Sequence, residues 1–338
     1  MNQHIRDIWG IEGDDIPYHL RQLGIDLEAL DNNGIYFYPL NNHYGLHTTE
    51  WYAQAKTRAL QARTVVFYDI VNIDDEASSK FIKFIDEFEH PRKLYLTVNQ
   101  SKNIKVDAEV IAWDFMWNRV KLYYVDTPPD IKFGEPDRVL HHYSGAGVYQ
   151  LTDLNFDQQR ARIFLNLCGR NYGYRNTLFE YAQQHSDQGY ISNRGKNITL
   201  ENPPSVGAYW PVPNSFYENS YFSVYVESNC EDPNLIHMTE KTFEPLIKGH
   251  FVLPFANPGS IARIQDLGFK LPDFIDYSYD TIDNHAVRFD AFIKEFCRLL
   301  TFDWPTLYAK HSNIILHNRT CLHSIPYDPS ILRIFNVY

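Results

Sequence analysis

The stretch from Tyr221 to Phe269 decides the fold; it contains YFSVYVESN at 221–229, MTEKTFEPLIKGHFVLPF at 238–255 and LGF at 267–269. Residues 221–226 are mostly aromatic or β-branched, which indicates a buried strand. Residues 242–248 fit a short helix closed by Gly249, and residues 251–255 form a second apolar strand. Such a strand–helix–strand unit normally makes two parallel strands with a right-handed crossover. Ligands of parallel sheets bind at the carboxyl ends of the strands, and Glu227 directly follows the first strand.

Pro245 suggests where the helix starts, because proline is harmless only in the first helical turn. We therefore expect the helix to begin near Thr242, with Thr239, Glu240 and Lys241 in the loop before it. A helix N-terminus with free N–H groups and an adjacent lysine suits a phosphate or diphosphate. The same spacing also fits two solvated charges at an ordinary helix start.

These residues resemble the donor-site signature of GT-B glycosyltransferases, most closely that of the fucosyltransferase-like and exostosin-like groups. The matching positions are Glu227, the T-E-K of residues 239–241, and Gly249 with Pro254 around the following strand. The resemblance implies that Glu240 and Lys241 contact the ribose and phosphates of a nucleotide sugar, with Thr239 beside them. Ser228 stands where the fucosyltransferases carry asparagine, which leaves the identity of the donor open. The resemblance covers residues 221–269 clearly and the second half of the chain loosely.

Composition and charge limit the class of protein. With 338 residues, 44% of them hydrophobic, the chain is long enough for two folded domains. The net charge of −11, without a basic tail, argues against binding to nucleic acid through bulk electrostatics. Four widely spaced cysteines favour neither a disulfide framework nor a zinc site. The chain has no apolar stretch of membrane-spanning length and no signal-peptide character, so we expect a cytoplasmic protein.

The order of the predicted elements indicates two α/β domains. In the first half we expect strands at 35–40, 64–71, 93–98, 110–113 and 120–125, and helices at 18–30, 48–63 and 76–88. In the second half we expect strands at 160–167 and 190–192 besides those of the opening stretch, and further helices at 177–184, 258–267 and 283–299. With a linker at 127–157, the domains are residues 1–150 and 151–338. Given the resemblance, we expect a GT-B-like fold: two Rossmann-like α/β domains facing a central cleft, with the nucleotide sugar bound by the second and the acceptor by the first.

Arg170 and Arg175 are candidates for binding the diphosphate. They flank a predicted loop that leaves the strand at 160–167 and enters the helix at 177–184, the same topology as the opening unit. In the GT-B enzymes that this chain resembles, that loop faces the donor, which implies that guanidinium groups there bind the diphosphate and stabilise the leaving nucleotide as charge develops. The alternative is ordinary surface charge. Arg194, after the strand at 190–192, is a weaker candidate.

An inverting transferase also needs a base that accepts the proton of the acceptor hydroxyl. The resemblance to GT-B enzymes implies a base on a loop of the first domain that faces the cleft, and His43, in the loop after the first strand, and Asp69, near the end of the second, are the best placed. Histidine has a suitable unperturbed pKa, which a nearby carboxylate would tune. Asp114 and Asp126 are further candidates. The chain contains 14 histidines, most of which we expect to be structural.

Several common chemistries have no support in the sequence. No D-x-D motif follows a predicted strand, so we expect no essential metal. There is no Walker loop, no G-x-S-x-G elbow and no G-x-G-x-x-G motif. The sequence therefore gives no support to an NTPase, a serine hydrolase or a standard dehydrogenase.

The leading hypothesis is an inverting, metal-independent glycosyltransferase that uses a nucleotide sugar as co-substrate and no other cofactor. Its acceptor would be a growing polysaccharide, a protein side chain or a modified base of phage or viral DNA, although the net acidity weighs against DNA. One alternative is a non-catalytic nucleotide- or saccharide-binding module, since fold does not fix function. Another is a structural interaction protein, which would have no affinity for nucleotides.

Overall fold

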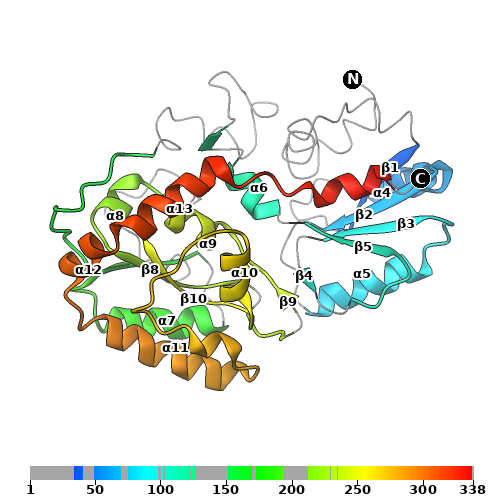
Figure 1. The fold of residues 1–338 in the computed structure, drawn as a ribbon. Helices are drawn as coiled ribbons and strands as arrows, with labels where there is room; N and C mark the ends of the chain where they lie inside the picture. Colours follow the sequence, from blue (N-terminus) through cyan, green and yellow to red (C-terminus); the bar gives the residue numbers. More distant parts are fainter. Residues whose placement is uncertain are drawn as a thin grey trace. The chain divides into compact units, whose positions relative to one another are not determined.

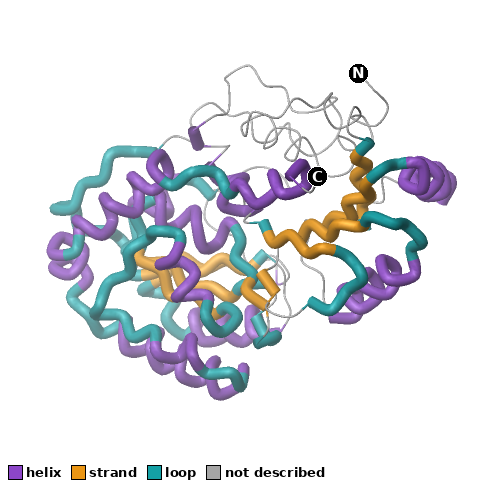
Figure 2. Tube along the Cα trace, turned by 45° about the vertical axis from the view of Figure 1, so that its right-hand side comes forward, coloured by secondary structure: helices purple, strands orange, loops and turns teal. Residues whose placement is uncertain are grey.

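The structure is a computed structural model that describes residues 34–40, 49–69, 75–97, 100–101, 104–113, 115–121, 124–125, 151–169, 173–193, 196, 212–228, 230–233 and 235–336. The chain divides into two compact units. The first comprises Met1–Leu122, Asp130–His141 and Tyr327–Tyr338; the second comprises Tyr123–Pro129 and His142–Pro326. Each unit is built on its own parallel sheet (Figures 1 and 2).

The sheet of the first unit has the strand order β1-β2-β3-β5, and its described strands are all parallel. The strands are β1 (Ile35–Pro39), β2 (Thr64–Asp69), β3 (Lys93–Thr97) and β5 (Glu109–Ala112), and the short strand β4 (Gln100–Ser101) follows β3. The helices are α4 (Thr49–Gln61), α5 (Asp75–Glu87), α6 (Phe115–Lys121) and α14 (Arg333–Asn336), with the 3-10 helix η5 (Pro329–Leu332). The central strand β2 reads TVVFYD because a strand buried on both faces needs a continuous apolar run.

Aromatic side chains fill the core of the first unit on one face of this sheet. Phe67 of β2 meets Phe88 edge-on, with ring centroids 5.1 Å apart, and Tyr38 of β1 stacks on Phe84 at 5.5 Å. Phe84 lies near the end of α5 and Phe88 directly follows the helix, and both rings pack on this face of the sheet.

The predicted strand at 120–125 is wrong at each of its described residues, because α6 extends through Val120 and Lys121 and residues 124–125 are in a π-helical turn. Trp117 and Val120 are both fully buried and lie three residues apart, a spacing that places them on one helix face. The segment after α6 is rich in aromatic and β-branched residues, and this composition suggested a strand.

The C-terminal segment belongs to the first unit. Asn118 of α6 donates to the carbonyl of Asp328 at 3.3 Å and accepts from its N–H at 2.7 Å. Arg333 forms an ion pair with Glu109 of β5 at 2.7 Å. The described residues after 326 thus pack against α6 and β5 of the first unit.

The sheet of the second unit has the order β10-β8-β6-β7, again parallel throughout. Its strands are β6 (Phe164–Cys168), β7 (Gly189–Asn193), β8 (Phe222–Val226) and β10 (Phe251–Phe255), and the short β9 (Leu235–Ile236) lies between β8 and α9 in the sequence. The helices are α7 (Gly173–Gln183), α8 (Asn214–Glu218), α9 (Glu240–Ile247), α10 (Ser260–Asp266), α11 (His285–Leu299), α12 (Trp304–Lys310) and α13 (Ser312–Ser324), with the 3-10 helix η4 (Ser278–Thr281). In Figure 1, α7 and α11 cover one face of this sheet, and α8, α9 and α13 cover the other.

The core of the second unit is dense in aromatic rings. Phe222, at the start of β8, stacks on Trp304 with centroids 4.7 Å apart, and Phe296 of α11 meets Phe164 edge-on at 5.1 Å. Gly189 opens β7 because a Cβ there would lie 2.2 Å from the Phe164 ring. The ring therefore occupies the place that any larger residue would need.

The strand order creates a topological switch point in this unit. The chain passes from β6 to β7 on one side, then returns across β6 to place β8 on the other side. Crossovers that leave in opposite directions cover opposite faces of the sheet, and open α/β sheets bind their ligands at the carboxyl ends of the strands where this happens, here β6 and β8. The residues that follow β8 are therefore where this unit is expected to bind a ligand.

The predicted strands at 221–226 and 251–255 are confirmed as β8 and β10, whereas two helix starts differ from the prediction. Helix α9 starts at Glu240, because Thr239 caps it. Pro245 consequently lies inside α9 and not in its first turn, so the bond from its position to the Lys241 carbonyl is missing. Helix α7 starts at Gly173, whose φ of 50° lets the chain turn directly into the helix.

Candidate functional site

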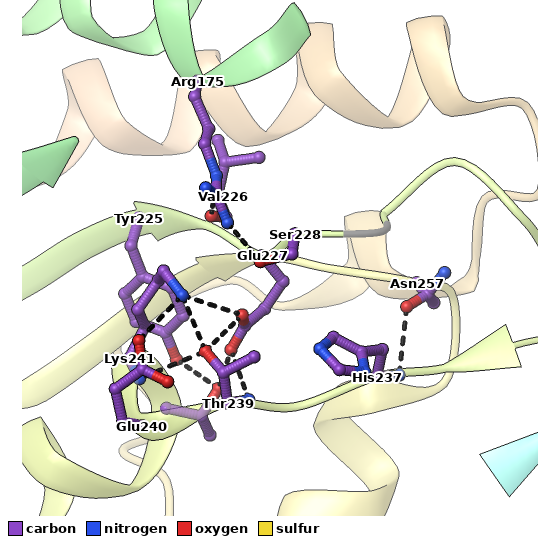
Figure 3. Close-up of polar contacts among 11 residues, drawn as sticks. Arg175, Tyr225, Val226, Glu227, Ser228, His237, Thr239, Glu240, Lys241 and Asn257 are labelled. Atoms are coloured by element: carbon purple, nitrogen blue, oxygen red, sulfur yellow. Dashed lines mark hydrogen bonds and ion pairs between the residues drawn. The ribbon is translucent and has the colours of Figure 1, made fainter. Parts of the chain in front are cut away.

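Glu227 stands one residue beyond β8, at the switch point (Figure 3). Its N–H donates to the carbonyl of Phe255 at 2.8 Å, which extends the ladder with β10 by one step. Its side chain is fully buried, at 0% exposed. A buried carboxylate needs several hydrogen-bond donors to remain stable, and the α9 N-terminus supplies them.

The Glu227 carboxylate accepts hydrogen bonds from both threonines of the T-E-K-T segment. Its Oε1 accepts from Thr239 N at 2.9 Å and from Thr242 Oγ1 at 2.8 Å, while its Oε2 accepts from Thr239 Oγ1 at 2.7 Å. An ionised carboxylate only accepts, so both hydroxyls are oriented as donors toward it. Glu227 thereby joins the end of β8 to the start of α9.

Tyr225 extends this network into the core. Its hydroxyl donates to Thr242 Oγ1 at 3.0 Å, which leaves the Thr242 proton for Glu227. Burial raises the pKa of Tyr225 well above 10, and the neighbouring Glu227 adds to the rise. Tyr225 therefore remains a protonated donor at neutral pH.

Thr239 is the N-cap of α9, and its oxygens accept hydrogen bonds from most of the N–H groups that a bound anion would need. Its side chain accepts from Lys241 N at 3.3 Å, and its carbonyl accepts from Thr242 N at 3.0 Å and Phe243 N at 3.4 Å. The expectation of free N–H groups at this helix start is therefore wrong for these three positions. Anion binding at this end of α9 would depend mainly on the lysine side chain.

Lys241 holds its ammonium over this cap. The Nζ atom lies 2.9 Å from Thr239 Oγ1, 3.1 Å from Glu240 Oε1 and 3.8 Å from Glu227 Oε2. The side chains of Lys241 and Glu240 are 23% and 27% exposed, in contrast to the buried Glu227. Glu240 and Lys241 are thus the two charged groups through which this cluster meets solvent, and they are the first two residues of α9 and not part of a preceding loop.

Arg175 does not lie on the predicted loop but is the third residue of α7, and it is buried. Its Nε donates to the carbonyl of Val226 at 3.2 Å, and a terminal nitrogen donates to Ser228 Oγ at 2.5 Å. It therefore binds the chain on both sides of Glu227 (Figure 3).

The other sequence-predicted site residues fall largely outside the described part of the chain. Asp69 is the last residue of β2, and its side chain is not among those described. Five further candidates lie outside the described residues altogether: His43, Asp114, Asp126, Arg170 and Arg194.

Sequence reasoning missed His237, which stands two residues before Thr239. It is buried beside Glu227 in Figure 3, and its N–H donates to Asn257 Oδ1 at 3.1 Å. Asn257 in turn donates to the carbonyl of Asp232 at 2.9 Å, so it connects two parts of the segment that leads into α9. Burial lowers the pKa of His237 to about 4, which keeps the imidazole neutral at pH 7. Its closeness to T-E-K in the sequence was the available signal.

The arrangement is suited to binding an anionic ligand and not to removing a proton. Lys241 offers a positive charge at the carboxyl end of β8, and Glu240 offers an acceptor for hydroxyl groups. The oxygens of Glu227 are directed to protein donors in a fully buried position, which is unsuitable for a general base.

Comparison with known proteins gives no assignment: no protein-family model matches the chain, and no curated protein or solved structure matches it significantly. Within the described residues, none of the helices combines the length and apolar character needed to span a bilayer. The described part of the chain also holds no group of three His, Cys, Asp or Glu side chains arranged around a metal.

Proposed function

We propose that this chain is a cytoplasmic glycosyltransferase that transfers a sugar from a nucleotide-activated donor to a hydroxyl acceptor, with inversion and without a metal. The donor would bind to the second unit at the carboxyl ends of β6 and β8. The acceptor would be a glycan, a protein side chain or, less favoured by the net charge of −11, a modified base of DNA.

The observation that carries the proposal is the position of Lys241. Its ammonium is fixed by Thr239 at the carboxyl edge of a parallel sheet, next to a topological switch point. That edge is where open α/β sheets bind nucleotides. The resemblance of residues 221–269 to a nucleotide-sugar site was inferred from the residue types, and the contacts of Glu227, Thr239 and Lys241 explain why those types are needed together.

In this proposal the diphosphate of the donor replaces the Glu240 carboxylate as the ion-pair partner of Lys241. The Glu240–Lys241 pair is partly exposed at 3.1 Å, and such a pair contributes little stability, so its separation costs little. Lys241 would then stabilise the negative charge that develops on the leaving nucleotide, and Glu240 would be released to accept from the ribose hydroxyls. Arg170 remains a candidate for a second cation.

The base that receives the acceptor proton is assigned to the first unit. His43 and Asp69 remain the candidates, since the oxygens of Glu227 are committed to Thr239 and Thr242. Loss of transfer with retained nucleotide binding in H43Q or D69N would support this assignment.

A thermal-shift screen with UDP, GDP, CMP, dTDP and ADP tests donor binding. A nucleotide at about 100 times its dissociation constant should add about 2.7 kcal/mol to the free energy of unfolding. We expect one nucleotide to raise the melting temperature without a metal, and K241A to abolish the rise. K310A, which removes an exposed lysine of α12, is the matched control. If no nucleotide stabilises the wild type, the proposal fails.

A non-catalytic nucleotide- or saccharide-binding module is the second candidate. It is favoured by the complete commitment of Glu227 to structural hydrogen bonds, because a binding module needs an ordered lysine but no base. Slow hydrolysis of the matching nucleotide sugar in the absence of an acceptor would favour the transferase. Binding without any hydrolysis would favour the module.

A further inference from the structure

The parallel ladder between β6 and β8 stops after the first residues of the two strands. Phe164 pairs with Phe222 and Leu165 pairs with Ser223, and no later pair follows although both strands are described throughout. By contrast, β8 stays paired with β10 along its whole length, and β6 stays paired with β7. The separation therefore occurs only between β6 and β8, toward their carboxyl ends, which is the topological switch point.

Two side chains supply hydrogen bonds in place of the missing ladder. Asn166 Nδ2 donates to the carbonyl of Val224 at 2.9 Å, and Arg175 Nε donates to the carbonyl of Val226 at 3.2 Å. Alternate residues of a strand direct their carbonyls to the same neighbouring strand. The carbonyls of Val224 and Val226 therefore face β6, as the carbonyl of Phe222 does. The next two carbonyls of the ladder are thus satisfied by side chains, as buried carbonyls must be.

Asn166 indicates that this separation is a specific feature of the fold. Its Oδ1 is buried and has no hydrogen-bond partner among the described residues. An unpaired buried acceptor is destabilising, and asparagine is a poor strand former. The residue is nonetheless in the middle of a buried strand, where its amide donor holds Val224.

Arg175 also makes a second contact with the chain after β8: it donates to Ser228 Oγ at 2.5 Å. Its planar, rigid guanidinium spans Val226 and Ser228 and so determines the direction of the chain at Glu227. We propose that Arg175 is a positioning residue: it acts through Val226 and Ser228 to place Glu227 against Thr239, and through Thr239 it places the Lys241 ammonium. Its effect on ligand binding rests on the proposed function, whereas its effect on the chain does not.

Amide hydrogen exchange tests the positioning without any ligand. In R175M we expect the amides of Thr239 and Lys241 to exchange roughly tenfold faster than in the wild type, with β8 and β10 unchanged. R175K should not restore the slow exchange of these amides, because a single ammonium cannot make the two hydrogen bonds of the guanidinium in the same geometry. R162M is the control, since the guanidinium of the half-buried Arg162 donates to the adjacent carbonyl of Ala161 and lies over the Tyr190 ring, and neither contact involves Glu227 or Thr239. Unchanged protection of Thr239 and Lys241 would overturn the proposal, as would equal acceleration in β8 and β10.

Affinity for UDP and GDP tests the consequence for binding. The wild type, R175M, K241A and the double variant form a cycle. If Arg175 acts through Lys241, the loss caused by R175M largely disappears when Lys241 is absent. Losses that multiply, or a full rescue by R175K, would show that Arg175 contacts the phosphates directly and would overturn the proposal. If neither nucleotide binds the wild type and CMP, dTDP and ADP do not stabilise it either, the proposed function has failed, and hydrogen exchange alone decides the role of Arg175.

Discussion

Thr239 and Glu227 are joined by two hydrogen bonds across twelve positions of sequence. The N–H of Thr239 donates to Oε1 at 2.9 Å and its hydroxyl donates to Oε2 at 2.7 Å. Both residues are buried, and the same hydroxyl accepts from the backbone and the side chain of Lys241. This pair connects the end of a strand to the start of a helix and holds the one ammonium group of the described cluster.

The first prediction concerns the stability conferred by Glu227. E227A leaves the donors of Thr239 and Thr242 unpaired in a buried place, so the free energy of unfolding should fall by about 3 kcal/mol or more. Chemical denaturation measures the change. E180A is the control, because Glu180 makes an exposed ion pair with Lys196 and should cost less than about 1 kcal/mol. A loss in E227A no larger than that of the control would contradict the network.

The second prediction separates the hydroxyl of Thr239 from its methyl group. T239S keeps the Oγ that caps α9 and bonds Glu227, so its free energy of unfolding should stay within about 0.5 kcal/mol of the wild type. T239A removes the cap and should cost about 1–2 kcal/mol. Equal losses in the two variants, measured by denaturation, would show that the methyl packing matters and the cap does not.

The third prediction follows from the Glu240–Lys241 pair. In the absence of ligand, Glu240 lies 3.1 Å from the ammonium and competes with any anion for it. E240Q should therefore bind inorganic pyrophosphate roughly two- to fivefold more tightly than the wild type. The same variant should bind the stabilising nucleotide no more tightly, if Glu240 contacts the ribose. Calorimetric titration measures both affinities, and weaker pyrophosphate binding in E240Q would refute the exchange.

The fourth prediction is a loss of stability in acid caused by His250. Burial is the main reason that its pKa is lowered to about 3, with Arg160 and Lys248 contributing. In the fold it bonds Ser223 Oγ at 2.9 Å and the carbonyl of Tyr217 at 2.8 Å. Between the unfolded pKa of about 6.5 and the folded value, the unfolded chain binds more protons, so stability falls as pH falls, by up to about 1.4 kcal/mol per pH unit.

The test is to compare the free energy of unfolding of H250Q and the wild type at pH 7 and pH 5. The wild type should lose more over this interval. His237, with a pKa of about 4, adds a loss of the same sign that H250Q retains. Equal losses in the two proteins would show that His250 does not titrate on unfolding.

The fifth prediction has the opposite sign and concerns Asp280. Its carboxylate accepts from Gly259 N at 2.9 Å and Ile261 N at 3.0 Å at the start of α10, and burial raises its pKa to about 6. Between about 6 and the ordinary aspartate pKa of 3.8 the folded state binds the proton more readily, so this group adds stability as pH falls. D280N should therefore lose stability more steeply than the wild type between pH 6 and pH 4. Identical pH profiles in urea denaturation would contradict this.

Helices and strands could be predicted from the sequence where burial restricts which residue types occur. Both faces of β8 and β10 are covered, so their sequences are continuously apolar or aromatic and their bounds are clear. Helix starts were harder, because two rules competed at α9. The proline rule favoured a start near Thr242, while the capping bond of Thr239 was strong enough to start the helix at Glu240 and leave Pro245 inside it.

The sequence by itself determined the α/β character of the chain and the place of Thr239, Glu240 and Lys241 at the start of a helix between two strands, since these depend on local periodicity and capping. Only the tertiary structure decided that β6 and β8 separate, that Glu227 is buried against Thr239, and that Arg175 reaches Val226 across fifty-one positions. The physical reason is that residue type reports how far a position is buried. The partner that satisfies a buried polar group depends on which strands become neighbours, and residue type does not report it.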